Sequence, residues 1–406
     1  MTNPPAIDLL SVASFANGQP HEQFRWLRRN APVYWHPEPH GRGFWAVTRY
    51  HDVRAIGRDP KTYSSYQGGI LIDDPGGPAL AATRNMMLMM DPPQHTRYRQ
   101  LVSRQFTPHS VQALRPRIEE LAARIIDRVS ARGECDLVRD IAGELPSYVI
   151  ADLMGIPLED GRRLYELTEK MHASEEAVTQ DQRAIASMEM LNYAMGVADD
   201  KRTHPGADLA TQLLNSQIDG DRLTPAEYGL FFMLLINAGG DTTRNLLAAG
   251  MLALLNNPGQ RRLLEKDLEG RLPGLVEEML RYVSPVIYMR RTATCDTELG
   301  GMKIGAGDKV VMYYGSANRD ETVFTNPDEF DIGRTPNDHI AFGGGGTHFC
   351  LGAHIARLEI QVMLREIFTR LPDIRPAGPP QWLASNFISG LTHLPVQFTA
   401  KGQDRM

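Results

Sequence analysis

The stretch Phe342-Gly343-Gly344-Gly345-Gly346-Thr347-His348-Phe349-Cys350-Leu351-Gly352 brings one cysteine to the end of a glycine-rich loop. From Ala353 to about Leu371, apolar side chains recur at helical spacing, so Cys350 is expected at or just before the N-terminus of a helix. Unpaired backbone N–H groups and the positive end of the helix dipole favour a thiolate there and lower its pKa. The stretch therefore predicts Cys350 as a metal ligand, and its glycines allow a flat, bulky group to lie against the backbone.

A second informative stretch is a long apolar segment. It opens with Thr224-Pro225-Ala226-Glu227, a capping box with proline at the first helical position, and continues to Asn256. This predicts one helix of about 30 residues, roughly 45 Å long. In its middle lies Ala238-Gly239-Gly240-Asp241-Thr242-Thr243, where the two glycines together cost about 2 kcal/mol relative to alanine.

The glycine pair predicts a local widening against which a small ligand can lie, and a threonine hydroxyl can bond back to a carbonyl one turn earlier. A hydroxyl next to a carboxylate that exchanges protons with bulk water forms a proton relay. Asp241 and Thr242 are therefore candidate catalytic residues. The alternative is a buried helix that contains an accidental glycine pair and a satisfied aspartate.

The remaining chain is predicted to be mainly helical with small β-sheets. Two short strand patterns, Pro32 to Trp35 and Phe44 to Thr48, flank a Pro/Gly turn and indicate a β-hairpin. Helices are expected at Val111 to Ser130, Leu145 to Met154 and Gln182 to Asp200, and later strands at Tyr288 to Thr294, Lys309 to Tyr314 and Pro395 to Ala400.

Composition narrows the class of protein. The 406 residues are 42% hydrophobic and contain no Pro/Ser/Gly-rich linker or repeat, which favours one domain over residues 1–406. The net charge of -6 offers no basic footprint for nucleic acid. Only three cysteines occur, Cys135, Cys295 and Cys350, which argues against a disulfide framework and for the cytoplasm.

No membrane anchor is expected. The N-terminal stretch Met1 to Asp8 lacks a basic region followed by an apolar one, and no apolar run approaches the roughly 20 residues that span a bilayer.

These motifs resemble the cytochrome P450 superfamily, soluble bacterial type. In its haem loop, glycine four before, a basic residue two before and glycine two after the proximal cysteine match Gly346, His348 and Gly352. One feature departs from the family's pattern: the aromatic Phe342 lies eight rather than seven positions before Cys350. The resemblance implies the triangular, mainly α-helical P450 fold, heme b (iron protoporphyrin IX) with Cys350 as iron ligand, and Asp241 and Thr242 as the acid and alcohol of the oxygen-binding motif.

The resemblance also assigns charged residues. Glu278, Arg281 and Arg334 match the family's buried structural triad. Carboxylates of the haem need donors, and the resemblance offers His95, Arg99, Arg291 and His348, although Arg290 competes with Arg291 by strand register. The further haem contacts that it implies are Ala238, Gly239, Phe342, Gly343 and Gly352.

By the same resemblance, an apolar substrate pocket is expected. The run Met86 to Met90 suits an adjustable wall, and it equally suits ordinary core filling. The motifs are most similar to those of P450s that act on methyl-branched lipids, terpenoids and sterol side chains. The pocket residues expected are Met87, Leu234, Ala238, Val286, Ile287, Phe387 and Ile388.

The function that the resemblance implies is hydroxylation of an unactivated C–H bond with O2 and two electrons. Because no flavin or iron–sulfur motif is visible, the electrons would come from a ferredoxin and its NAD(P)H-dependent reductase, docking near Arg97, Arg104 and Arg357. The alternatives are a peroxide-driven haem enzyme, a haem-free cysteine hydrolase that pairs Cys350 with His348 or His354, and a haem-binding sensor or carrier.

Overall fold

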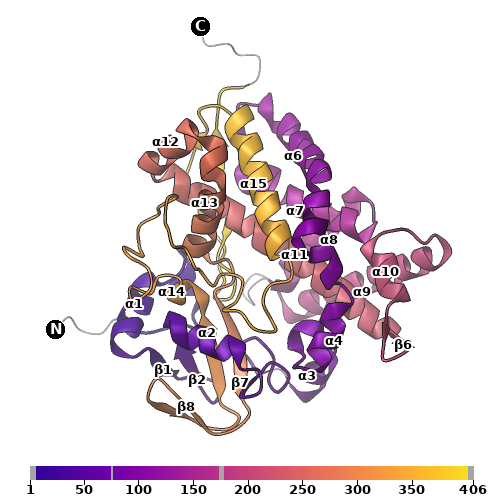
Figure 1. The fold of residues 1–406 in the computed structure, drawn as a ribbon, viewed down its shortest axis with the longest axis vertical. Helices are drawn as coiled ribbons and strands as arrows, with labels where there is room; N and C mark the ends of the chain where they lie inside the picture. The colour runs from indigo at the N-terminus through magenta and orange to yellow at the C-terminus, as the bar shows by residue number, and fades with distance from the viewer. Residues whose placement is uncertain (1–5, 75, 173–177, 401–406) are drawn as a thin grey trace.

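The computed structural model describes residues 6–74, 76–172 and 178–400, and in these ranges the chain is mainly helical with small sheets. Figure 1 shows the strands β1, β2, β7 and β8 in one corner with α1, α2 and α14, while the other helices fill the rest. The predicted fold class is confirmed. Residues 1–5, which belong to the stretch expected to lack a targeting signal, lie outside the described residues.

The α-helices are α1 His21–Asn30, α2 Tyr50–Arg58, α3 Gly77–Thr83, α4 Gln94–Gln100, α5 Pro108–Ala113, α6 Arg115–Ser130, α7 Glu144–Met154, α8 Leu158–His172, α9 Gln180–Thr203, α10 Leu209–Asn215, α11 Pro225–Leu255, α12 Pro258–Lys266, α13 Leu268–Val283, α14 Tyr314–Ala317 and α15 Ala353–Arg370. Shorter helical turns are η1 Val12–Phe15, η2 Met87–Met89, η3 Ser103–Phe106 and the π-helical η4 Leu137–Ala142.

The largest sheet has the strand order β1-β2-β10-β7-β3, from β1 Val33–His36, β2 Phe44–Val47, β10 Lys309–Tyr313, β7 Tyr288–Ala293 and β3 Tyr63–Ser64. The smaller sheets contain β4 Glu134–Asp136 with β11 Arg375–Pro376 and β14 Pro395–Gln397, then β5 Gln217–Ile218 with β6 Asp221–Arg222, β8 Thr297–Leu299 with β9 Met302–Ile304, and β12 Gln381–Trp382 with β13 Leu391–His393.

The predicted hairpin is present. β1 and β2 pair antiparallel, with Val33 opposite Val47 and His36 opposite Phe44. β10 then joins β2 in parallel and β7 antiparallel, so segments distant in the sequence complete the sheet. This sheet carries β7 to the edge of the site described below.

The long helix α11 has the predicted start, because Thr224 accepts from the backbone N–H of Glu227 while the Glu227 side chain accepts from Thr224. It is 31 residues long and runs without a break through Gly239 and Gly240. A Cβ atom on Gly240 would lie 3.2 Å from Cδ2 of Tyr165 on α8. Close packing of α8 therefore accounts for this glycine, in addition to any ligand.

One predicted helix is divided. The expected segment from Val111 to Ser130 forms two helices, α5 and α6, that meet at Leu114. Pro116 lacks a backbone N–H, and its ring clashes with the carbonyl four residues earlier, that of Gln112. Val111 therefore belongs to the shorter α5, and α6 restarts with Pro116 in its first turn.

Three charged residues predicted to be structural lie together. Glu278 and Arg281 on α13 are fully buried, and their side chains form two hydrogen bonds of 2.8 and 2.7 Å. Arg334 donates to the same carboxylate at 3.2 Å, and Arg281 also donates to the carbonyls of Pro327 and Glu329. The network ties α13 to the segment that leads to the cysteine loop.

Replacing Glu278 with glutamine should lower the free energy of unfolding by about 3–5 kcal/mol, because two arginines lose their shared buried counter-charge. Chemical denaturation of the wild type and the variant measures this. Glu269→Gln is the matched control, since Glu269 pairs with Arg365 at the surface and should cost less than about 1 kcal/mol. Equal losses in the two variants would contradict the structural assignment.

Candidate active site

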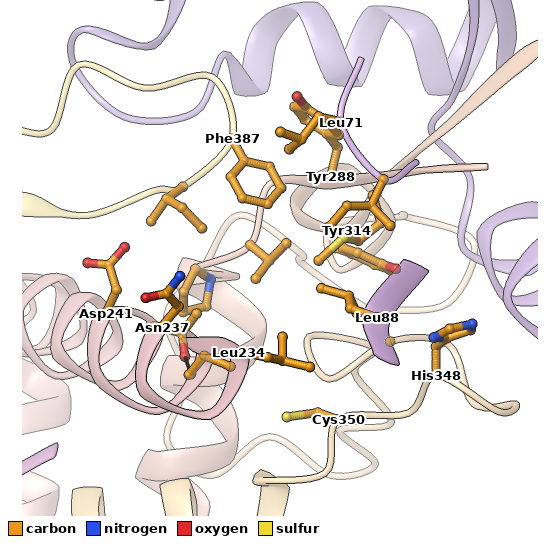
Figure 2. A pocket seen from close by; sticks show the side chains of 18 of the residues that line it. Leu71, Leu88, Leu234, Asn237, Asp241, Tyr288, Tyr314, His348, Cys350 and Phe387 are labelled. Atoms are coloured by element: carbon orange, nitrogen blue, oxygen red, sulfur yellow. Dashed lines mark hydrogen bonds between the residues drawn. The ribbon is translucent and has the colours of Figure 1, made fainter. Parts of the chain in front are cut away.

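A large cavity lies between α11 and the cysteine loop. Its volume is about 1180 Å³, above the roughly 300–1,000 Å³ of a usual small-molecule site. Figure 2 shows Asp241, Asn237 and Leu234 on the α11 side and Cys350 and His348 on the loop. The cavity thus has room for more than one bound group.

Cys350 lies three residues before the first residue of α15 and lines the cavity. Its backbone N–H donates to the carbonyl of Phe342 at 2.9 Å, which closes the loop despite the additional glycine. Burial raises the pKa of the Cys350 thiol, while the backbone N–H of Gly352 and the cations Arg99 and Arg357 favour the thiolate. The predicted lowering of this pKa is therefore wrong for the free thiol, because desolvation outweighs the hydrogen bond and the two cations.

The glycines of this loop let α2 pack closely against one side of it, and several of them also line the cavity. Gly343, Gly345 and Gly346 have φ near +90°, a region that other residues rarely adopt. A Cβ atom on Gly344 would lie 2.8 Å from Cα of Arg54 on α2, and one on Gly346 would overlap the carbonyl of Gly57. Gly343, Gly344 and Gly345 also line the cavity. The loop is therefore held between α2 and the space in front of Cys350.

Four basic side chains meet at one side of the cavity: His95, Arg99, Arg291 and His348. The rings of His95 and His348 lie 4.1 Å apart between centroids. Burial, then Arg99, lowers the pKa of His95 to about 4, and burial, then Arg291, lowers that of His348 to about 2. Both imidazoles are thus neutral N–H donors, whereas Arg99 and Arg291 carry the charge.

Strand β7 decides between the two candidate arginines. Arg291 lines the cavity. Arg290 points to the other face, where it donates to the carbonyls of Ile72 and Asp73 and pairs with Asp74 at 2.8 Å. Successive side chains of a strand point to opposite faces, so only one of them can reach the cavity.

The residues around this cavity fit a haem. The Nδ1 atoms of His95 and His348 are buried and have no hydrogen-bond partner among the described residues. Within the same ranges Arg99 and Arg291 form no ion pair with a carboxylate, and each donates only to a backbone carbonyl. Unpaired buried donors are costly, so a ligand that carries carboxylates would satisfy them while Cys350 faces its metal.

On α11, Asp241 and Thr242 both line the cavity. The Thr242 hydroxyl donates to the carbonyl of Ala238 at 3.1 Å, as expected for a threonine that bonds back one turn. Asp241 is buried and accepts from Nδ2 of Asn245 at 3.0 Å.

Asp241 also belongs to a charged chain that the sequence analysis missed. Nη2 of Arg244 lies 3.6 Å from Oδ1 of Asp241, and Nη1 of Arg244 pairs with the half-exposed Glu169 on α8. The spacing of three residues between Asp241 and Arg244 was the available signal. Glu169 could not be found this way, because it is distant in the sequence.

Most of the predicted pocket residues line the cavity: Met87, Leu234, Ala238, Val286, Phe387 and Ile388. Ile287 does not, and its prediction is wrong. Val286 and Tyr288 line the cavity, whereas the buried Ile287 packs into an apolar cluster with Phe44 and Tyr288. Of the methionine run, Met86, Met87 and Met89 line the cavity and Met90 is core. The further predicted haem contacts, Gly239, Phe342, Gly343 and Gly352, also line it.

Residues 144–372 match the family model for cytochrome P450. The chain is 38% identical to a "Steroid C26-monooxygenase" of Rhodococcus jostii, over 98% of this chain and 86% of that protein. It is 41% identical to a "Methyl-branched lipid omega-hydroxylase" of Mycobacterium tuberculosis, over 93% and 90%.

The solved structures agree. The Mycobacterium marinum cytochrome P450 CYP268A2 in complex with pseudoionone superposes with a TM-score of 0.92 at 37% identity, covering 98% of this chain and all of that one. CYP267B1, a myxobacterial P450 in complex with myristic acid, gives 0.87 at 35% identity, covering 97% and 99%.

A buried carboxyl on α15 generates a prediction. Glu359 is 4% exposed and lines the cavity, and its Oε2 atom has no hydrogen-bond partner among the described residues. Burial raises its pKa from 4.5 to about 8. At a pH between these two pKa values, Glu359 keeps a proton in the folded protein that it has released in the unfolded chain. The free energy of unfolding therefore falls as the pH rises.

The free energy of unfolding of the wild type, minus that of Glu359→Gln, should therefore fall by about 1.4 kcal/mol per pH unit. The fall should extend from about pH 4.5 to about pH 8 and level off above pH 8. Chemical denaturation of both proteins at several pH values measures the difference. A difference independent of pH would show that Glu359 is ionised in the folded protein.

Proposed function

Because the chain belongs to the cytochrome P450 family, whose cofactor is a haem with a thiolate ligand, we propose that it hydroxylates an unactivated C–H bond of a hydrophobic small molecule. The observation that carries this proposal is that Cys350 faces the same cavity as Asp241 and Thr242. The relatives' names support a substrate that is terpenoid, branched-chain or sterol-like.

The cofactor we propose is heme b, held by Cys350 as iron ligand. His95, Arg99, Arg291 and His348 would bind its carboxylates, and Ala238, Gly239, Phe342, Gly343 and Gly352 would lie against it. Bound haem supplies the one-electron and O2 chemistry that amino-acid side chains lack. As its ligand, the sulfur of Cys350 would donate electron density that favours O–O cleavage.

The catalytic residues we propose act on protons. Asp241 is buried but connected through Arg244 to Glu169 at the surface, so its carboxylate has a charged path toward solvent. Thr242 lies next to it and lines the cavity. Its hydroxyl donates to the carbonyl of Ala238, so its oxygen would accept a hydrogen bond from a proton donor or water at the reaction point. The apolar wall excludes other water, which limits unproductive proton delivery.

We further infer that the electrons come from a ferredoxin with its NAD(P)H-dependent reductase, since the chain shows no flavin or cluster motif. Of the arginines suggested for docking, Arg357 is held by Glu277 at 2.6 Å, and Arg97 pairs with Asp219 at 2.7 Å. Arg104 is exposed. Product formation that needs both proteins would support this partner.

We also infer that residues 1–406 form one domain, since an apolar cluster extends from Met87 to Phe398 and the largest sheet joins the early strands β1, β2 and β3 to β7 and β10. The sparse cysteines support a cytoplasmic location. Within the described ranges, none of the helices has the length and apolar character that crossing a membrane requires.

The alternative functions find less support. Neither His348 nor His354 hydrogen-bonds the Cys350 sulfur in the described ranges, so the dyad of a cysteine hydrolase is not formed. A peroxide-driven enzyme would not need the proton relay, whereas Asp241 and Thr242 both line the cavity. A sensor or carrier would form no product with a competent redox chain.

The reduced protein should show the red-shifted Soret band of a haem-thiolate on binding carbon monoxide. Cys350→His should abolish this band while haem remains bound, because imidazole replaces the thiolate. The reduced, carbon monoxide-bound minus reduced difference spectrum measures it. A folded, haem-loaded wild type without the band would sink the thiolate assignment, and a protein that takes up no haem would restore the hydrolase.

Thr242→Ala should divert electrons from product into hydrogen peroxide, because proton delivery loses its hydroxyl. We expect the rate of product formation to fall on the order of 10²-fold, the lower end for a positioned proton donor. Product and peroxide per NAD(P)H consumed are the measurements. Thr242→Ser keeps the hydroxyl and should restore most of the coupling, so an unchanged yield in Thr242→Ala would remove Thr242 from the relay.

A further inference from the structure

A polar side chain lies within an apolar part of the wall that α11 presents to the cavity. Asn237 lines the cavity beside Met233, Leu234 and Leu235, which are all apolar. Figure 2 shows it on α11 next to Asp241. Its oxygen Oδ1 accepts a hydrogen bond of 2.8 Å from the hydroxyl of Thr168 on α8.

Thr168 determines which end of the amide faces the cavity. This hydroxyl is fully buried and has a single proton, for which the carbonyl of Leu164 competes at 3.2 Å. The bond to Asn237 is the shorter of the two, so Oδ1 is turned toward α8. The Nδ2 group, with two N–H donors, has no hydrogen-bond acceptor among the described residues.

An unpaired donor in this place discriminates between ligands. A hydrophobic ligand that fills the cavity displaces water from Nδ2 and, without an acceptor, leaves the N–H groups unsatisfied. A ligand with an acceptor oxygen at that point avoids this loss. Sites built to hydrogen-bond a polar group reject analogues that lack it more strongly than apolar pockets reject a missing methylene.

The position of Asn237 along the helix sets where the oxygen lies. Asn237 and Thr242 are five residues apart on α11, an offset of roughly 7.5 Å along its axis. An oxygen held by Asn237 therefore places a carbon several bonds away beside Thr242, where we propose that protons are delivered.

We propose that Asn237 is a specificity-determining residue, whose Nδ2 group donates a hydrogen bond to a carbonyl oxygen of the substrate. The preferred substrates are then hydrophobic ketones or esters whose carbonyl lies several bonds from the oxidised carbon. Thr168 is a positioning residue that holds the amide in the donating orientation. The inference rests on the proposed function and deepens it.

The test uses geranylacetone, an isoprenoid methyl ketone, with two analogues in which a methylene group or a hydroxyl-bearing carbon replaces the carbonyl. Dissociation constants are measured on haem-loaded protein by equilibrium dialysis and by the ligand-induced Soret shift. The wild type should bind the ketone at least about tenfold more tightly than the hydrocarbon, a difference of 1.4 kcal/mol.

Asn237→Leu, similar in size but without donors, should remove this preference by weakening ketone binding. Asn237→Asp, which keeps the oxygen and loses the N–H groups, should do the same and covers the case in which the leucine variant fails to fold. Thr168→Val should reduce the preference in part. Leu230→Ile, a change of shape on α11 at a position that does not line the cavity, should leave the ratio of the two constants unchanged.

Three results would overturn the inference: no ketone preference in the wild type, a preference that persists in both Asn237 variants, or tighter binding of the alcohol than of the ketone. The last would show that Oδ1 faces the cavity. These outcomes are separate from failure of the proposed function, because the carbon monoxide spectrum of the same wild-type protein reports haem-thiolate ligation independently of Asn237.

Discussion

The hydrogen bond from the backbone N–H of Cys350 to the carbonyl of Phe342 is the contact on which the site depends. It closes a loop whose glycines adopt backbone conformations that other residues avoid. The loop also lies directly against α2, where Gly344 and Gly346 leave no room for a side chain. Held in this way, the loop places Cys350 in the lining of the cavity.

Charge is distributed in two ways around this loop. On the structural side, Arg281 and Arg334 share the carboxylate of Glu278, so each of these arginines has a carboxylate partner within the protein. On the cavity side, Arg99 and Arg291 have no carboxylate partner in the described ranges, and two neutral histidines offer unpaired N–H donors. An anionic ligand in the cavity would supply Arg99 and Arg291 with the carboxylate partner that the structural arginines already have.

Features that depend only on residues close together in the chain could be predicted from the sequence. The capping box at Thr224 fixed the start of α11, and the back-bond of Thr242 to Ala238 follows from the helical pitch. Local reasoning failed at Pro116, which divides a predicted helix, and at Ile287, which packs into an apolar cluster instead of lining the cavity. The register of β7 likewise stayed open between Arg290 and Arg291 until pairing with β10 set it.

By itself, the sequence determined the family and the mainly helical fold, and it singled out Cys350 and the pair Asp241–Thr242 as candidate site residues, because each appears in a short run of residues with characteristic spacing. Only the tertiary structure decided which polar groups are satisfied. In the sequence, Asn237 is a single amide in an apolar helix. The structure shows that Thr168, 69 residues away, donates a hydrogen bond to its oxygen. In the sequence, Glu359 is an ordinary helical glutamate. In the structure, burial without a hydrogen-bond partner for Oε2 among the described residues raises its pKa to about 8. Hydrogen bonding and desolvation depend on what lies nearby in space, and that is set by the packing of segments distant in the chain.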